Sequence, residues 1–466
     1  MAANVVQVRD VILVSPHPNS NSTGSTTEST LPLTYFDTFW LKFPPVERLF
    51  FYQLTDITHH LFDSVILPSL TRSLSLALLH YLPLAGKIKW SMQAPKPAIF
   101  YSPNDAVSVT VAESTADNFD RLSSDDVYEA VEVRPLTPEL HTSDDFADLI
   151  SFQITLFPNK GFSIGVSTHH AIFDGKSSTT FIKSWTYLCK SQSNNEEQSL
   201  TLELTTSFDR TVIKDPAGVD VSFVEKWFGL GGQYSSTPNS RSLKVFPSIG
   251  TVKNWVRATF VLTRDDFKKL RDRVHEHEVR ESKKLHLSTF VLTCAYVFVC
   301  MVKARGGDGD RQVLLGFTAD YRARLDPPIP SNYFGNCVVT AVVFAKARDF
   351  KEENAVAVAA EKLSEAIKGL ENKGAVEGLE EILALYKTIQ LGEIQLLGTA
   401  GSARFGIYGT DFGWGRPKKV EIVSTDRTGS VALAESRRGD GGVEVGLVLE
   451  KHEMEAFASL FNQGLN

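Results

Sequence analysis

Cysteine is scarce in this chain, and its spacing suits neither a metal site nor a redox pair. Only four cysteines occur among 466 residues, at positions 189, 294, 300 and 337, and none belongs to a CxxC motif. Three of them lie within apolar runs, where an unpaired cysteine packs as a small hydrophobic side chain. We therefore expect reduced thiols in the core, no bound metal, and a cytoplasmic protein.

Blocks of positive charge and long apolar runs are also lacking. The 48 lysines and arginines are fewer than the 55 acidic residues, which gives a net charge of −7 without a basic block. This pattern argues against a nucleic-acid-binding surface and a polybasic membrane segment. The strongest candidate for a membrane span, residues 290–302, is shorter than the ~18–20 apolar residues that a spanning helix needs, so we predict a buried helix there. The run Val11–Val14 is too short for a secretory signal. We expect no membrane partner and a monomer.

Motifs of nucleotide and metal chemistry are missing as well. The chain has no Walker A sequence and no GxGxxG after a strand, which argues against nucleotide hydrolysis and a nicotinamide cofactor. The histidines at 59, 60, 275 and 277 have neither an HExxH pattern nor a third ligand nearby. We interpret them as parts of solvated faces.

The order of strands and helices predicts mixed α/β layers. A chain of this length is too long for one ordinary core, and its elements mix without strict βαβ alternation. We place a first domain at residues 1–190, a crossover region at 191–250 and a second domain at 251–466. The expected strands are 5–14, 150–157, 162–168, 256–262, 313–318, 336–344, 405–409, 419–424 and 443–449. The expected helices are 62–81 with a kink or boundary at Pro68, one beginning at Ser177 or Ser178, 265–280, one from Ser288, helices within 354–390, and 451–462.

The most informative motif is the run 168–175, THHAIFDG, which closes the second strand of a predicted hairpin. Histidine is the usual side chain for moving a proton near neutral pH, and a strand that ends in a loop is a typical place for a catalytic group. An isolated HxxxD pattern is weak, and a core or surface histidine is the competing interpretation. The glycine turn and the helix that follow leave room for a substrate beside His170, which favours catalysis.

Two neighbouring residues each allow a second interpretation. Asp174 either orients the imidazole of His170, as in a triad, or turns away to hold the loop through a buried arginine. Gly175 indicates a tight turn, which favours the structural role. Residues 161–165 also match GxSxG, but Ser163 lies near the start of a strand instead of at a sharp strand-to-helix turn, so we reject a nucleophile elbow.

A second unusual run, TDFGWGRP at residues 410–417, completes a resemblance that covers nearly the full chain. The chain resembles the plant BAHD acyltransferases. Further segments that carry the likeness are Leu31–Asp37, Tyr81–Gly86, Phe208–Thr211 and Asp320–Pro328. HHxxxDG alone also fits condensation domains of peptide synthetases, whereas DFGWGRP and Tyr333–Cys337 narrow the likeness to the BAHD branch. The latter run and the block Asp209–Pro216 are similar to the subgroup that acylates anthocyanin, flavonoid and other phenolic glucosides, often from malonyl-CoA.

The resemblance implies two similar-sized, chloramphenicol-acetyltransferase-like domains with a solvent channel between them. By this likeness His170 is the general base, and Asp174 pairs with Arg322 to support the histidine loop. Asp411 is structural and remote from the chemistry. A contribution of Trp414 to oxyanion stabilisation stays open.

The likeness also implies an acyl-CoA co-substrate and no bound cofactor. Candidate CoA contacts lie in the second domain, where each has an ordinary surface residue or helix cap as its alternative: Lys253, Arg257, Thr259, Ser288 and Thr289. Lys176, two residues after Asp174, is a candidate partner for the carboxylate of a malonyl group, with a solvated lysine as its alternative.

The expected function is transfer of malonyl from malonyl-CoA to a sugar hydroxyl of a flavonoid, isoflavonoid or other phenolic glucoside. The runner-up is a hydroxycinnamoyl-CoA-dependent enzyme with the same acceptors. Two interpretations of other classes are a serine esterase that uses Ser163 and a non-catalytic relative that binds metabolites or proteins. The aglycone and the acylated hydroxyl depend on channel loops that have no readable sequence code.

Overall fold

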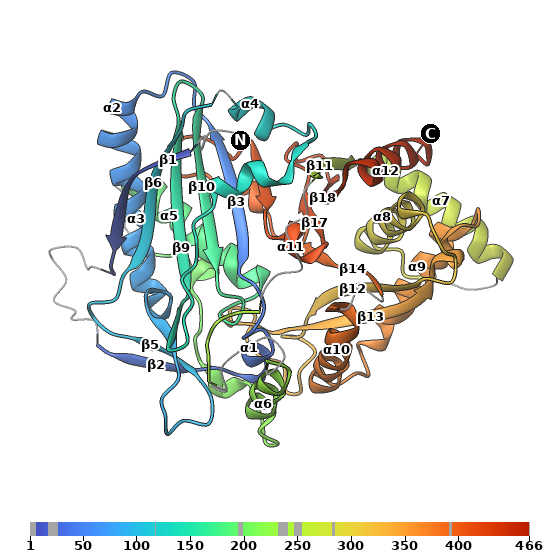
Figure 1. Cartoon of the computed structure of the whole chain (residues 1–466), viewed down its shortest axis with the longest axis horizontal. Coiled ribbons are helices and arrows are strands. Elements are labelled where there is room, and N and C mark those ends of the chain that lie inside the picture. The colour runs from blue at the N-terminus through green and yellow to red at the C-terminus, as the bar shows by residue number, and fades with distance from the viewer. Residues whose placement is uncertain are drawn as a thin grey trace.

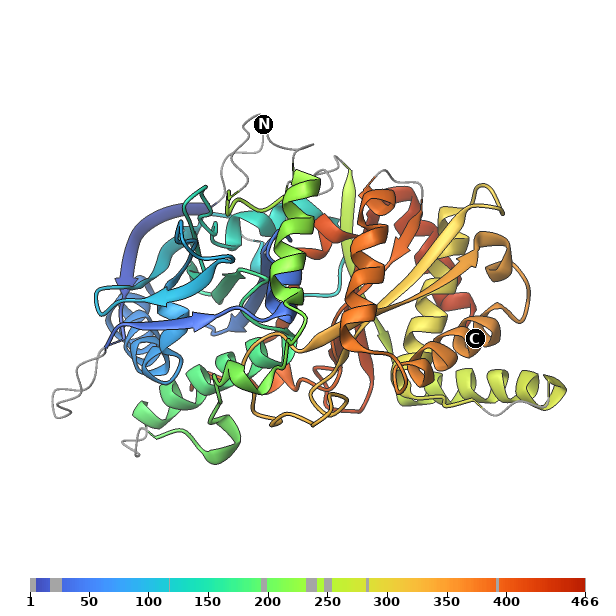
Figure 2. The same ribbon diagram turned by 90° about the horizontal axis from the view of Figure 1, so that it is seen from below.

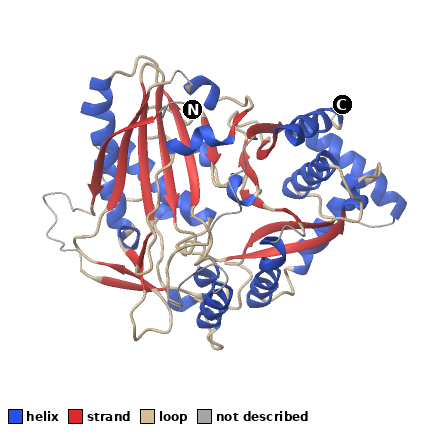
Figure 3. Cartoon of the chain, in the orientation of Figure 1, coloured by secondary structure: helices blue, strands red, loops and turns tan. Residues whose placement is uncertain are grey.

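The computed structural model describes residues 6–16, 27–116, 118–193, 199–231, 241–246, 254–281, 285–390 and 394–465. Elements from the amino-terminal part gather on one side of the molecule and elements from the carboxy-terminal part on the other (Figure 1), and the view turned by 90° shows the same division (Figure 2). Strands form inner layers with helices packed outside them (Figure 3). The expected mixed α/β architecture is confirmed.

A six-stranded sheet forms the frame of the first half. Its strands, in spatial order, are β1 (Val6–Val14), β6 (Val107–Ser114), β9 (Ile150–Phe157), β10 (Gly161–Thr168), β3 (Val46–Gln53) and β16 (Lys419–Ile422). The predicted hairpin is present, since β9 and β10 pair antiparallel from Phe157–Gly161 to Ile150–Thr168. Every residue of both strands is buried, so the small polar face of β10 is covered as fully as its apolar face.

The second half contains a five-stranded and a three-stranded sheet, and a small four-stranded sheet completes the first half. The five strands are β15 (Thr399–Gly401), β17 (Val431–Glu435), β18 (Val443–Glu450), β11 (Trp255–Leu262) and β7 (Tyr128–Glu129). The three are β13 (Val338–Lys346), β12 (Gln312–Asp320) and β14 (Gln395–Leu397). The four are β2 (Ser29–Pro32), β5 (Ala98–Tyr101), β4 (Lys87–Lys89) and β8 (Phe146–Asp148).

Two strands cross between the halves. β16 comes from the carboxy-terminal part of the chain but pairs with β3 at the edge of the first sheet. In the other direction, β7 pairs with β11 in the five-stranded sheet. The domain boundaries at 190 and 250 stay a prediction, and strand pairing links residues on either side of them.

Helices pack around these sheets, and the short α1 (Tyr35–Phe39) among them is fully buried. They are α1 (Tyr35–Phe39), α2 (His59–Leu61), α3 (Leu67–His80), α4 (Phe119–Leu122), α5 (Gly175–Ser193), α6 (Val219–Gly231), α7 (Arg264–Glu281), α8 (Thr289–Arg305), α9 (Ala355–Gly369), α10 (Ala375–Gln390), α11 (Thr425–Thr428) and α12 (Lys451–Gln463). α3 packs on α5, where the indole of Trp185 donates to the Leu70 carbonyl at 3.1 Å. The predicted buried helix is α8, in which every residue from Val291 to Val302 is buried.

One helical run, His59–His80, is long and apolar enough by length and composition to cross a membrane. The run consists of α2, a π-helical turn at Phe62–Ile66 and α3. Pro68, where a kink or boundary was expected, lies in the first turn of α3, just after the π-helical turn. Its residues Phe62, Ile66, Leu70 and Leu74 lie in the core of the first half. Packing against the sheet therefore accounts for its apolar face.

One expected helix start and one expected strand were wrong. The helix after the histidine motif begins at Gly175 instead of Ser177 or Ser178, because the Asp174 carboxylate accepts the Ser177 amide at 2.9 Å and starts the helix earlier. The expected strand at 405–409 is a short 3₁₀ turn, Ile407–Gly409, which follows Gly406 in the left-handed region at φ 63°.

Separate hydrophobic clusters support the two halves. One surrounds the six-stranded sheet and the other contains α8 and the strands of the second half. All four cysteines are unpaired and buried within these cores, as expected. Burial raises the pKa of the Cys189 thiol to about 11, so it is unreactive at neutral pH.

Candidate active site

His170 lies in the short loop between β10 and α5. Strand β10 ends at Thr168 and α5 begins at Gly175, so buried elements hold both ends of the loop. The preceding His169 points into the core, whereas His170 keeps partial access to solvent. Its imidazole stacks on the indole of Trp40, with ring centroids 4.1 Å apart and an interplanar angle of 9°. The ring of Phe43 meets the imidazole edge to face, with ring centroids 6.0 Å apart.

The surroundings of His170 keep its imidazole neutral. Burial lowers the pKa of His170 to about 4, although its own backbone carbonyl and the charge of Asp174 act in the opposite direction. Nδ1 is buried and has no hydrogen-bond partner among the described residues. A neutral imidazole at physiological pH has a free lone pair, which is the form that a general base requires.

A buried amide from the second half holds the backbone of this loop. The side-chain amide of Asn336 donates to the carbonyl of His170 at 3.1 Å and to the carboxylate of Asp37 at 3.1 Å. Asn336 is fully buried and lies two residues before the start of β13, and Asp37 belongs to α1. Trp40 and Phe43 carried no sequence signal of their own, and Asp37 belongs to the run Leu31–Asp37, which supported the resemblance but had no assigned role. Asn336 belongs to the run Tyr333–Cys337, which supported the resemblance but had no assigned role.

Asp174 turns away from His170 and forms the expected pair with Arg322. Its carboxylate lies 2.8 Å from Nη2 of Arg322, and both side chains are almost fully buried. The same carboxylate accepts the backbone amides of Ser177 at 2.9 Å and Cys337 at 3.2 Å. Arg322 in turn donates to the carbonyls of Tyr333 and Gly335. The ion pair therefore fastens the histidine loop to the second half.

Asp411 and Trp414 lie far from His170. The Asp411 carboxylate accepts the amides of Gly413 at 2.8 Å and Gly415 at 2.9 Å, and it lies 3.1 Å from Nζ of Lys190. Lys190 is in the last turn of α5, about 22 Å along the helix from its start at 1.5 Å per residue. This placement agrees with the structural role expected for Asp411.

Trp414 packs near the start of β10, whereas the histidine loop follows the end of that strand. Its ring meets the ring of Phe162 at a centroid distance of 6.0 Å. Phe162 lies at the start of β10, about 20 Å along the strand from Thr168. The indole of Trp414 thus lies beside the start of β10, and the question of its role in oxyanion stabilisation stays open.

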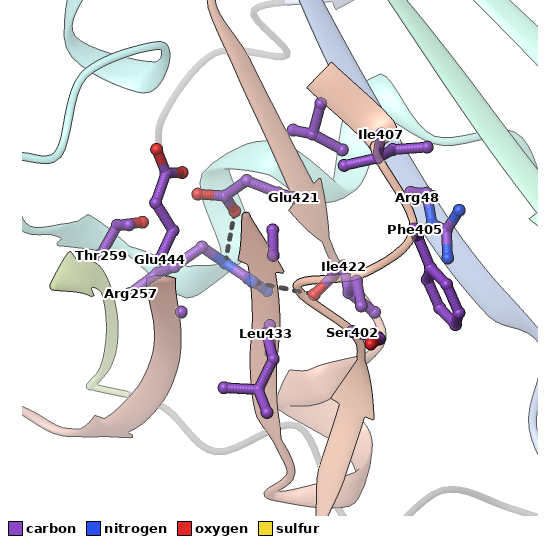
Figure 4. A pocket seen from close by; sticks show the side chains of 15 residues that line it. Arg48, Arg257, Thr259, Ser402, Phe405, Ile407, Glu421, Ile422, Leu433 and Glu444 are labelled. Carbon is purple, nitrogen blue, oxygen red and sulfur yellow. Dashed lines mark hydrogen bonds and ion pairs between the residues drawn. The ribbon is translucent and has the colours of Figure 1, made fainter. Parts of the chain in front are cut away.

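A small cavity lies where strands of the two halves meet (Figure 4). Arg48 of β3 and Ile422 of β16 line it from the first sheet, and Thr259, Leu433 and Gly446 line it from the second. Phe405 also lines it. The ring of Phe405 packs so closely on Gly175 that an added Cβ would lie 2.8 Å from it. Phe405 therefore lies between the cavity and the start of α5, which directly follows the histidine loop.

A second, smaller cavity lies beside β10, the strand that leads into the histidine loop. Its lining includes Arg48, Val166, Thr168 and Ser178. Arg48 lines both cavities, and Thr168 lies two residues before His170. The lining of neither cavity includes His170 itself, whose loop lies between Thr168 and Gly175.

Arg257, one of the expected CoA contacts, is held by contacts within the protein, and its role in CoA binding stays a prediction. Arg257 is only 2% exposed, and its guanidinium lies 3.2 Å from Glu421 and donates to the carbonyls of Ile422 and Val423. These contacts use its donors to join β11 to β16, as the dashed lines in Figure 4 indicate. The guanidinium is therefore held mainly by groups of the protein itself, although its Nε, which lies beside Glu421, makes no hydrogen bond among the described residues.

The other four expected CoA contacts differ in position. Thr259 lines the larger cavity. Ser288 is the N-cap of α8 and accepts the Val291 amide at 3.2 Å, and Thr289 is exposed at the first position of that helix. Lys253 lies outside the described residues. The contacts of Ser288 are those of the helix-cap alternative, and a role of any of these residues in CoA binding stays a prediction.

Lys176 and Ser163 have ordinary structural surroundings. The Lys176 side chain is 42% exposed, and its Nζ lies 3.5 Å from the Asp320 carboxylate. Ser163 is fully buried in the middle of the sheet, paired opposite Thr155 and Phe51. It does not lie at a strand-to-helix turn, so the rejection of a nucleophile elbow is confirmed. Among the described residues no group of three or more His, Cys, Asp or Glu side chains is arranged to hold a metal.

The sequence of this chain is similar to those of known transferases. The family model described as Transferase family matches residues 19–463. Phenolic glucoside malonyltransferase 1 of Arabidopsis thaliana is 46% identical over 471 residues, which span 99% of this chain and 98% of the relative. The chain belongs to this transferase family, as a BAHD acyltransferase.

Other relatives of this BAHD acyltransferase support the same assignment. Malonyl-CoA:anthocyanidin 5-O-glucoside-6''-O-malonyltransferase of Arabidopsis thaliana is 45% identical, with 99% of each chain covered. Among solved structures, vinorine synthase matches with a TM-score of 0.69 over 98% of both chains at 20% identity, which shows the common fold. The resemblance drawn from the sequence motifs is confirmed.

Proposed function

We propose that this acyltransferase moves a malonyl group from malonyl-CoA to a sugar hydroxyl of a phenolic glucoside, with His170 as the general base. The observation that carries the proposal is the 46% identity to a phenolic glucoside malonyltransferase over nearly the whole of both chains. The neutral, partly accessible imidazole of His170 at the junction of the two halves supports it.

The reaction follows from the position and protonation of His170. The hydroxyl oxygen of the acceptor attacks the thioester carbonyl carbon while the imidazole takes its proton. The tetrahedral adduct then collapses, the carbon–sulfur bond breaks, and the imidazolium returns the proton to the CoA thiolate. The products are the malonyl ester and free CoA thiol, so every proton and electron pair is accounted for.

The same surroundings explain why the base acts without a triad. Asp174 is fully engaged by Arg322 and backbone amides, so it does not orient the imidazole. Stacking on Trp40 and the hydrogen bond from Asn336 to the loop carbonyl hold the ring in place instead. Such positioning reduces the entropic cost of bringing base and hydroxyl together.

The test measures release of free CoA thiol by the purified enzyme with a flavonoid glucoside and malonyl-CoA, acetyl-CoA or coumaroyl-CoA. We expect acceptor-dependent release, fastest with malonyl-CoA. His170→Ala should reduce kcat by about 10²- to 10⁴-fold, the usual contribution of a positioned base. Ser163→Ala is the matched control, because a serine esterase would lose activity in that variant whereas a His170-dependent transferase would keep it.

The outcomes separate the alternatives. Fastest release with coumaroyl-CoA would favour the hydroxycinnamoyl-dependent enzyme and contradict the malonyl donor. Ester hydrolysis without CoA, lost in Ser163→Ala, would favour the esterase. No release from any donor across a panel of phenolic glucosides would favour the non-catalytic relative.

A further inference from the structure

The larger cavity contains four charged side chains, and three of them are neutralised within the protein. Arg257 pairs with Glu421 at 3.2 Å. Glu444, which also lines the cavity, accepts two hydrogen bonds from the guanidinium of Arg437 at 2.7 and 2.9 Å. The fourth charged residue is Arg48.

Arg48 is a buried cation without a carboxylate partner. It is 7% exposed, and its one hydrogen bond among the described residues runs from Nη1 to the hydroxyl of Thr179 at 3.2 Å. That hydroxyl donates its own proton to the Gly175 carbonyl at 2.7 Å, so it is free to accept from Arg48. Figure 4 draws two dashed lines from Arg257 and none from Arg48. No acidic side chain of the described residues forms an ion pair with Arg48.

An unpaired buried charge is costly, and a protein keeps one only where something offsets the cost. Burial lowers the pKa of Arg48 to about 10, while the charge of Glu435 acts on it in the opposite direction from beyond ion-pairing distance. The guanidinium nevertheless stays protonated at neutral pH. It offers a planar fork of donors that matches a carboxylate in two parallel hydrogen bonds.

Arg48 also lies at the same end of the sheet as the proposed base. In the pairing of β3 with β10 it stands opposite Val166, four residues before His170. Its partner Thr179 belongs to the first turns of α5, which directly follow the histidine loop. One methylene separates the carboxylate of malonyl-CoA from the thioester carbonyl, so a residue that binds this carboxylate has to lie close to the base.

We propose that Arg48 binds the free carboxylate of the acyl group and thereby selects a dicarboxylic acyl donor over a neutral one. The inference rests on the proposed malonyl transfer and names the residue that sets its donor preference. Lys176 is a weaker choice, because its ammonium is exposed to solvent and already lies beside Asp320.

The test compares kcat/KM for malonyl-CoA and acetyl-CoA with one neutral glucoside as acceptor. In Arg48→Gln the ratio of malonyl to acetyl should fall about 10- to 100-fold, the usual effect of a lost charge-assisted hydrogen bond. Arg121→Gln is the matched control: its guanidinium is 43% exposed and pairs with Glu132 on the surface, and its ratio should stay at the wild-type value. Lys176→Ala should also keep the ratio.

Arg48→Lys keeps the charge and tests the geometry, and it also covers the case in which Arg48→Gln does not fold. An ammonium cannot form the two parallel hydrogen bonds, so the malonyl-to-acetyl ratio of Arg48→Lys should lie between those of Arg48→Gln and the wild type. If only Arg48→Lys folds, its ratio should lie below that of the wild type. An unchanged ratio in the folded Arg48 variants would overturn the inference, as would an equal loss with both donors. A fall in Lys176→Ala alone would assign the carboxylate to Lys176. Wild-type enzyme that does not use malonyl-CoA would overturn the proposed function itself.

Discussion

At the start of helix α5 the Asp174 side chain is 2% exposed and pairs with Arg322 at 2.8 Å. Near the end of the same helix, Lys190 lies 3.1 Å from the carboxylate of Asp411, whose side chain is 25% exposed. Each aspartate belongs to one of the two motifs that identify the family, and each accepts two backbone amides. They differ in what they join. Asp174 connects the histidine loop to Arg322 and Cys337 in the second half, whereas Asp411 mainly holds the turn that it begins.

This comparison indicates that burial of the partner, more than the motif itself, decides how much each aspartate matters. A carboxylate that is buried with its arginine leaves an uncompensated charge when one partner is removed. A carboxylate near the surface leaves a lysine that water solvates again. The effects of mutation should therefore differ strongly between the two ends of one helix.

Asp174→Asn should have the largest effect. The amide cannot neutralise Arg322, which keeps only the more exposed carboxylate of Asp320, 3.0 Å from its Nη1. We therefore expect a loss of about 3 kcal/mol in the free energy of unfolding, the lower end of the range for a broken buried pair. Urea unfolding followed by circular dichroism measures this. The double variant Asp174→Asn with Arg322→Met, which removes the stranded charge, should recover part of the loss. A loss below about 1 kcal/mol would mean that the pair is not the anchor described here.

Acid should weaken the start of α5 more than its end. Burial lowers the pKa of His169 to about 3 from an ordinary value of 6.5, so the unfolded chain binds a proton at this residue before the folded chain does. Stability is then fully present above pH 6.5 and is lost as the pH falls toward 3. Between pH 7 and pH 5 the loss should be about 2 kcal/mol, at 1.36 kcal/mol per pH unit below 6.5.

His169→Asn is the variant that isolates this effect. Nδ1 of His169 accepts the Ala171 amide at 3.2 Å, and the asparagine carbonyl can take over that bond without titrating. Urea unfolding at pH 7 and pH 5 should give a smaller difference for the variant than for the wild type. Equal differences would show that His169 does not titrate on unfolding.

Much of the fold was predictable because its local signals agree. Alternation in Phe162, Ile164 and Val166 around a Pro-Asn-Lys-Gly turn predicts the β9–β10 hairpin. A serine before a long apolar run predicts the capped, buried α8. The exchange of β16 into the first sheet was not predictable, since a short strand carries no record of which sheet it joins.

The site was predictable only in part, for a similar reason. His170 stands out because its motif is contiguous in sequence, and the pairing of Asp174 with Arg322 came from the family likeness alone. The ion-pair partners of Arg257 were not predicted, because Glu421 and Asp426 are distant from it in sequence. The stacking of Trp40 on His170 was not predicted either, because these two residues are also distant in sequence. Contacts between distant segments depend on the packed sheets, which periodicity does not encode.

Asp411→Asn should have a smaller effect than any change at the start of the helix. The pKa of Asp411 is lowered, since the amides of Gly413 and Gly415 and the charge of Lys190 together outweigh the effect of burial. Asparagine retains an oxygen for both amides but loses the charge, so we expect a loss of about 1 kcal/mol at pH 7. Urea unfolding measures it, and kcat/KM should stay within about twofold of wild type, because His170 lies some 20 Å away along the helix. A loss as large as that of Asp174→Asn would remove the difference between the two ends.

Lys190→Ala should have the smallest effect and separates the two contributions at Asp411. Its side chain is 54% exposed and its Nζ lies 3.1 Å from the carboxylate. An exposed pair of this kind contributes about 0.2–1 kcal/mol and is screened by salt. The loss should therefore be smaller than that of Asp411→Asn and should shrink further in 1 M sodium chloride. If Lys190→Ala instead cost as much as Asp411→Asn and the cost did not change with salt, the ion pair rather than the two glycine amides would hold the DFGWG turn.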